Sequence, residues 1–160
     1  MTNMRVMVVE DNEIDLTVIT TALVAAGIEF KAVAKSTDAL QVALEYKPSI
    51  AILDMNMPEL SGRELQEQLR THPETTLVKI IFLSASESIE DVVYGLNLQA
   101  SAYFKKGVRI GQVISNINAI DGTSRIRSSL NDFASYNKRI AEKYSSICSR
   151  QGGEACGPLY

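Results

Sequence analysis

The sequence predicts an α/β fold: a doubly wound, five-stranded parallel sheet of strand order 2-1-3-4-5, followed by a C-terminal helical extension. Short apolar runs alternate with segments of helical spacing over the first 120 residues, which is the pattern of repeated β-α units. The apolar runs are continuous, so each strand is expected to be buried on both faces. Right-handed crossovers between parallel strands then leave few topologies, of which this order is the simplest.

The first five elements follow from apolar runs and from residues that end helices. Gly27 is a suitable left-handed end for the first helix, and Pro48 stops the second. Ser36 is the expected N-cap of that second helix. The elements expected are a strand at Arg5–Val9, a helix at Asp15–Ala26, a strand at Phe30–Ala34, a helix at Ser36–Tyr46 and a strand at Ser49–Leu53.

The next elements have similar signals. Ser61 and Glu64 form a capping box that opens the third helix, which ends near His72 and Pro73. The remaining elements expected are a strand at Lys79–Leu83, a helix opened by Ser88–Asp91, a short strand at Ala102–Phe104 and a helix at Ile110–Ile120.

The composition is that of an ordinary globular chain, with 46% hydrophobic and 22% charged residues. Aromatic residues make up 6% and Trp is absent, which argues against an aromatic stacking surface for single-stranded nucleic acid. The apolar stretches are far shorter than the ~20 residues that span a bilayer, and no secretory signal is visible. The two cysteines, Cys148 and Cys156, do not form the dense pattern of a disulfide-stabilised protein, so a cytoplasmic location is expected.

Polar side chains follow four of the five predicted strands. Because the carboxyl ends of parallel strands meet at one edge of a sheet, we expect these side chains to gather there. Carboxylates in such proximity repel one another, and an oxygen-only ligand set without clustered His or Cys favours Mg²⁺. The groups are Glu10 and Asp11 after the first strand, Asp54 after the third, Ser84 after the fourth, and Lys105 and Lys106 after the fifth.

A carboxylate beside Mg²⁺, a hydroxyl and an ammonium group form a set suited to phosphoryl transfer. An Asp can act as the nucleophile and form an aspartyl-phosphate. The metal and a Lys neutralise charge on the transferred group, and a Ser hydroxyl donates to another of its oxygens. Taken alone, each of these residues has a simpler interpretation as a helix cap or a turn residue. Their joint placement at the strand ends favours the functional interpretation.

These residues resemble the receiver domain of two-component response regulators, with the flavodoxin-like fold of the chemotaxis response regulator, over roughly residues 4–122. By this resemblance Asp54 is the phosphoacceptor, and Glu10 and Asp11 are the acidic pair that binds the metal. The matching positions also include Pro58 and Gly62 after Asp54, then Ser84, the aromatic Tyr103 and Lys106 three residues later.

The resemblance implies further roles. The backbone carbonyl of Asn56 would complete the Mg²⁺ site, and Asn56 and Ser86 would flank the phosphoryl group and set its hydrolysis rate. Ser84 and Tyr103 would move after phosphorylation by a histidine kinase or a phosphotransfer protein, and a downstream protein target would read the change. No enzyme activity beyond self-catalysed phosphotransfer and dephosphorylation is expected.

Two positions near the lysine leave alternatives open. The family usually has a proline after the lysine, and Gly107 stands there, which predicts a looser loop. Lys105 is a second candidate for the site lysine, although Lys106 keeps the spacing to Tyr103. Tyr103 could also be a plain surface aromatic on an edge strand.

The apolar spacing of residues 123–150 predicts a helix with a narrow heptad seam. A disordered tail is expected at residues 151–160. Asn137 falls at an a position, which favours a parallel two-stranded pairing and hence a homodimer. The same stripe could instead pack back on residues 1–122, the predicted receiver, or lead to an output domain beyond the chain. The seam consists of Ile126, Leu130, Phe133, Asn137, Ile140, Tyr144 and Ile147.

Three other function classes are alternatives to a receiver that acts on its own. A flavodoxin-like cofactor binder needs a phosphate-binding loop after the first strand, where Glu10, Asp11 and Glu13 would repel a phosphate. A receiver portion of a larger regulator, with an output enzyme such as one for cyclic-dinucleotide turnover, remains the alternative reading. Binding to DNA is disfavoured, because the few basic residues after residue 122 are scattered along one helix; membrane binding is not expected either.

Overall fold

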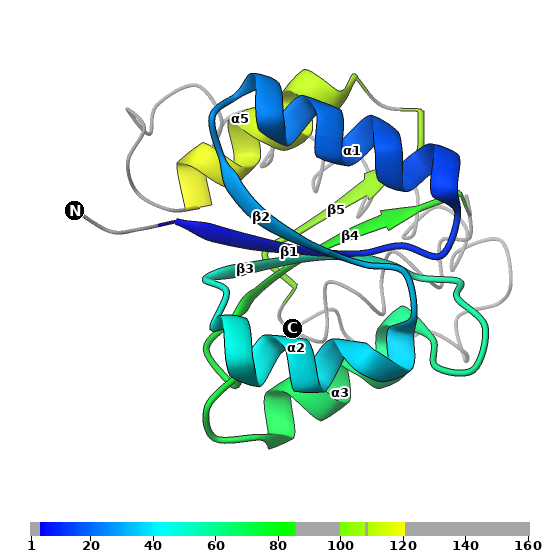
Figure 1. Ribbon diagram of the computed structural model, residues 1–160, viewed down its shortest axis with the longest axis vertical. Coiled ribbons are helices and arrows are strands. Elements are labelled where there is room, and N and C mark those ends of the chain that lie inside the picture. The colour runs from blue at the N-terminus through cyan, green and yellow to red at the C-terminus, as the bar shows by residue number, and fades with distance from the viewer. Residues whose placement is uncertain (1–3, 86–99, 108, 121–160) are drawn as a thin grey trace, which may run out of the picture.

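The computed structural model describes residues 4–85, 100–107 and 109–120. Five parallel strands form one sheet in the order β2-β1-β3-β4-β5, which confirms the predicted topology. Helices α1 and α5 cover one face of the sheet, and α2 and α3 cover the other (Figure 1). The elements are β1 Arg5–Val9, α1 Glu13–Ala25, β2 Glu29–Val33, the 3-10 turn η1 Ser36–Asp38, α2 Ala39–Tyr46, β3 Ile50–Asp54, α3 Gly62–Thr71, β4 Lys79–Ser84, β5 Ala102–Lys105 and α5 Ile110–Ile120.

The core consists of two apolar layers, one on each face of the sheet. Met7, Leu53 and Phe82 point toward α2 and α3, whereas Val6 and Ile52 lie in the layer beneath α1 and α5. Every residue of β3 is buried, as a central strand covered on both faces requires. Burial on both faces of the sheet therefore explains why the apolar runs in the sequence are continuous.

Helix α1 begins at Glu13, two residues before the predicted start. The Asn12 side chain is the N-cap, and it accepts hydrogen bonds from the backbone N–H groups of Ile14 at 3.0 Å and Asp15 at 3.1 Å. The helix was expected to start at Asp15, and Asn12 was not identified as its cap.

The expectation for Ser36 was wrong. Its hydroxyl donates a hydrogen bond to the backbone carbonyl of Pro58 at 3.0 Å, and the N-cap position of α2 falls on Asp38 instead. A 3-10 turn occupies Ser36–Asp38, and α2 starts only at Ala39. The contact ties this turn to the loop between β3 and α3.

The capping box of α3 is confirmed. The Ser61 hydroxyl accepts from the backbone N–H of Glu64, and the Glu64 carboxylate accepts from the backbone N–H of Ser61 at 2.8 Å. Ser86, the helix expected from Ser88 and the C-terminal seam lie outside the described residues. Among the helices of the described part, none has the length and apolar character needed to cross a membrane.

Candidate functional site

The site lies at the edge where the parallel strands end. Glu10 and Asp11 directly follow β1, Asp54 is the last residue of β3, and Ser84 is the last residue of β4. Lys106 follows β5, and its backbone N–H donates to the carbonyl of Ser84 at 2.7 Å. Because the strands run in the same direction, these five residues come together at one edge of the sheet, as the sequence predicted.

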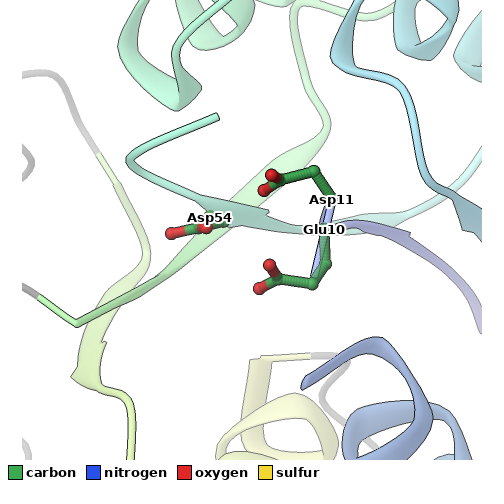
Figure 2. A group of neighbouring side chains, drawn as sticks. All are labelled: Glu10, Asp11 and Asp54. Atoms are coloured by element: carbon green, nitrogen blue, oxygen red, sulfur yellow. The ribbon is translucent and has the colours of Figure 1, made fainter. Parts of the chain in front are cut away.

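Three carboxylates form an acidic cluster, consisting of Glu10, Asp11 and Asp54. Each offers one oxygen that lies within 4.8 Å of the others. Figure 2 shows the three side chains turned toward the same region, two from the residues after β1 and one from the end of β3. Glu10 and Asp54 are buried, with 1% and 5% of their surface exposed, and Asp11 is exposed.

Burial has a measurable electrostatic consequence at Glu10. Loss of solvent raises the pKa of its carboxyl above the ordinary value, and repulsion from Asp54 acts in the same direction. A hydrogen bond with Lys106 and one from the Asn12 N–H to Glu10 Oε1, at 3.1 Å, oppose this shift without cancelling it. The contacts of Glu10 therefore compensate only part of the cost of burying its charge.

Lys106 provides the positive charge of the site. Its Nζ lies 2.8 Å from Glu10 Oε2, 2.8 Å from Asp15 Oδ2 and 3.1 Å from Asp54 Oδ2. Burial lowers the pKa of this ammonium, but hydrogen bonds to the three carboxylates outweigh that effect and hold the pKa above its ordinary value. Lys106 is therefore a fixed cation. Lys105, the alternative candidate, is exposed at the end of β5.

The donor set fits a small divalent cation. All three side chains of the acidic cluster offer oxygen, the ligand that Mg²⁺ prefers, and a cation would stabilise the charged form of Glu10, which burial and, to a lesser extent, repulsion from Asp54 disfavour. Asn56 lies two residues beyond Asp54, and its backbone N–H donates to Asp54 Oδ1 at 3.3 Å. The role of the Asn56 carbonyl as a metal ligand stays a prediction.

Ser84 and Tyr103 lie on neighbouring strands. Ser84 is fully buried at the end of β4. Tyr103 is 3% exposed and packs against Phe82, with ring centroids 6.4 Å apart, so it is not a plain surface aromatic. Their movement on phosphorylation stays a prediction.

The glycine of the Asp-x-x-x-Pro-x-x-x-Gly pattern has a steric reason. The backbone N–H of Gly62 donates to the carbonyl of Met55 at 3.0 Å. A Cβ at Gly62 would overlap the backbone carbonyl of Asp54. Only glycine lets the start of α3 approach the end of β3 so closely.

Gly107 also has a conformational reason. Its φ is 91°, in the region that glycine favours and that a proline ring, with φ fixed near −65°, cannot reach. The turn after Lys106 therefore follows a path that excludes the proline usual in the family. Whether this loop is looser stays a prediction.

Asp15 is a residue of the site that was not predicted from the sequence. It lies in the first turn of α1 and contacts Lys106 across 91 positions of the chain. Recognising Asn12 as an N-cap would have placed that first turn, and with it Asp15, next to the acidic pair.

Comparison with known proteins gives a consistent result. The family model described as "Response regulator receiver domain" matches residues 6–118. The transcriptional regulatory protein HprR of Escherichia coli (strain K12) is 30% identical over 116 residues, which is 72% of this chain and 51% of that protein. The polar-differentiation response regulator DivK of Brucella anthropi is 27% identical over 117 residues, 73% of this chain and 95% of that protein.

Solved structures are similar too. The receiver domain of Francisella response regulator 1452 is 25% identical, with a TM-score of 0.68. The match covers 77% of this chain and 100% of the Francisella chain. The chain spans about half the length of the curated transcriptional regulators that it matches, 51% and 48% for two of them.

Proposed function

This chain belongs to the response regulator receiver family, and from that premise we propose that Asp54 accepts a phosphoryl group in a step that requires Mg²⁺. The observation that carries the proposal is the acidic cluster, with oxygens within 4.8 Å of one another, beside the fixed cation Lys106. The donor is a histidine kinase or a phosphotransfer protein, as the family implies.

The reaction is a displacement at phosphorus. A carboxylate oxygen of Asp54 forms a bond to the phosphorus while the bond from phosphorus to the donor's imidazole nitrogen breaks. The electron pair of that bond leaves with the imidazole, and the product is an acyl phosphate. Hydrolysis later transfers the phosphoryl group to water and restores the carboxylate.

The residues around Asp54 have separate roles in this step. Glu10, Asp11 and Asp54, with the carbonyl of Asn56, would hold Mg²⁺, which would neutralise charge on the phosphoryl oxygens. The Lys106 ammonium neutralises a further phosphoryl oxygen. Three more roles belong to the proposal: Ser84 donates its hydroxyl, Tyr103 responds to the movement of Ser84, and Asn56 and Ser86 adjust the hydrolysis rate.

Intact-mass spectrometry tests this proposal. The full chain is incubated with Mg²⁺ and a small-molecule phosphodonor, and we expect the mass of one added phosphoryl group. Asp54→Asn should remove the addition, whereas Asp38→Asn, at an exposed acid in η1, should leave it intact. The proposal fails if the wild type remains unmodified, or if Asp54→Asn is modified to the same extent.

The output that we propose is protein–protein contact, with a homodimer formed through the helix predicted at residues 123–150 and with no enzyme activity, nucleic-acid binding or membrane binding. We also propose a cytoplasmic location, because the phosphoryl group must come from a histidine kinase or a phosphotransfer protein.

The support for the homodimer is the heptad seam with Asn137 at an a position. Light scattering should give a dimer mass for the full chain and a monomer mass for the Leu130→Lys, Phe133→Lys double variant. A monomer mass for the full chain would contradict the dimer, and a dimer mass for the double variant would contradict its formation through this helix.

One alternative has its own support. The chain corresponds to about half of the transcriptional regulators that it matches, at 51% and 48% of their lengths. It could thus serve as the receiver portion of a larger regulator, with an output unit, for example an enzyme for cyclic-dinucleotide turnover, outside these residues. A reading frame that continues past Tyr160 would favour this alternative.

A further inference from the structure

Lys106 has an acidic partner outside the acidic cluster. Its Nζ donates to Asp15 Oδ2 at 2.8 Å and to Asp54 Oδ2 at 3.1 Å, and it also lies 2.8 Å from Glu10 Oε2. Asp15 comes from the first turn of α1, not from a strand end. The Asn12 cap fixes that turn, because Asn12 accepts from the backbone N–H of Asp15 at 3.1 Å.

The three carboxylates around Lys106 differ in what else they do. Glu10 and Asp54 belong to the acidic cluster, so these two carboxylates contact the ammonium and are also candidate ligands for a divalent cation. Asp15 is not part of that cluster. Its side chain is 40% exposed, against 1% for Glu10 and 6% for Asp54, so it lies at the rim of the site. Of the three carboxylates that contact Lys106, Asp15 is therefore the one that does not belong to the acidic cluster.

We propose that Asp15 is a positioning residue that retains the Lys106 ammonium at the rim when a divalent cation occupies the oxygens of Glu10 and Asp54. The inference rests on the proposed function, since it concerns the same metal and the same lysine. Without Asp15, the carboxylates left to Lys106 are those that the cation needs. The ammonium then competes with the cation more strongly, and the affinity for Mg²⁺ falls.

A magnesium titration of four full-length proteins tests this role: wild type, Asp15→Asn, Lys106→Met and the double variant. Binding is followed by NMR at the backbone amide of Asn12, which donates to Glu10. We expect Asp15→Asn to raise the Mg²⁺ dissociation constant about threefold to tenfold, the effect of one well-placed charge pair. In the Lys106→Met background, the same substitution should change it less than about twofold, because no ammonium remains to compete.

Controls separate this role from other effects of charge. Glu13→Gln removes an exposed acid from the same helical turn and should leave the dissociation constant unchanged. Asp15→Ser serves as a second variant, and an unchanged thermal midpoint shows that α1 remains folded.

Each outcome has a distinct meaning. If the wild type does not bind Mg²⁺, the proposed function itself fails. If the wild type binds but Asp15→Asn has no effect, the role of Asp15 is overturned while the proposed function survives. An equal effect with and without Lys106 also overturns it, because Asp15 would then act only as a general negative charge.

Discussion

The buried carboxylate of Glu10 determines the electrostatic character of the site. Burial is the largest cause of its raised pKa, followed by opposing contributions from Lys106 and Asn12, and Asp54 adds repulsion. A raised pKa means that the folded state disfavours the charged form relative to the unfolded chain. The residue therefore lowers stability at neutral pH while it prepares the site for a cation.

The first prediction concerns Glu10→Gln in metal-free protein. Above the raised pKa, ionised Glu10 costs folding free energy; below the unfolded value near 4.5, it is protonated in both states and costs nothing. The substitution should therefore raise the free energy of unfolding at pH 7 by about 1 kcal/mol. The gain should fade as the pH falls toward 4.5. Urea unfolding at several pH values measures it, and a loss of stability at pH 7 would contradict the account.

The residues of the site were predictable to different degrees. Strand direction alone brings together the residues that end or follow strands, which are Glu10, Asp11, Asp54, Ser84 and Lys106. Asp15 was not predictable in this way, because its contact with Lys106 depends on where α1 begins. A helix start depends on a single cap and shifts by a residue or two without changing the apolar pattern.

At the level of elements, the junction between β3 and α3 lies at Asp54, the proposed phosphoacceptor. Ser61 and Glu64 cap α3, and the N–H of Gly62 donates to the carbonyl of Met55 at 3.0 Å. The absence of a side chain at Gly62 lets the helix start touch the backbone of Asp54. The geometry of this junction therefore controls where the Asp54 carboxylate lies.

The second prediction compares two glycines at the starts of helices. Gly62→Ala should destabilise the protein by about 3 kcal/mol, because the added Cβ overlaps the backbone of Asp54 and no flexible side chain can move aside. Gly111→Ala, in α5 with open space around the added Cβ, should stabilise by about 0.5 kcal/mol. Urea unfolding of both variants decides the point. Equal effects would show that the close approach at Gly62 is not a constraint.

The elements themselves were largely predictable, and their ends were less so. The strands β1 and β4 and the helix α5 begin where the apolar pattern placed them. Ser36 was assigned to a helix cap because Ser is common there, but its hydroxyl bonds to Pro58, 22 residues away. Local pattern cannot reveal a long-range partner of this kind, so such errors gather at element ends.

At the level of the whole molecule, a metal held by the acidic cluster would couple its binding to folding. The oxygens of Glu10, Asp11 and Asp54 come from the ends of two strands and converge only in the folded chain. A ligand that binds the folded state alone stabilises it by mass action. Metal binding should therefore be visible as a change in global stability.

The third prediction is that Mg²⁺ raises the thermal midpoint. At ten times its dissociation constant, Mg²⁺ should add about 1.4 kcal/mol, or roughly 3–6 °C for a domain of this size. Asp11→Asn should abolish most of this shift, because Asp11 is the exposed member of the acidic cluster and its loss leaves the fold intact. Differential scanning calorimetry measures the shift. The same rise in Asp11→Asn would show that Mg²⁺ acts elsewhere.

The most direct test of the central claim is to locate the phosphoryl group within the chain. After phosphorylation in the presence of Mg²⁺, borohydride reduces an aspartyl-phosphate to homoserine, and peptide sequencing by mass spectrometry finds the altered position. The account predicts homoserine at residue 54 alone. Modification at Asp11 or at another acid, with Asp54 unchanged, would contradict it.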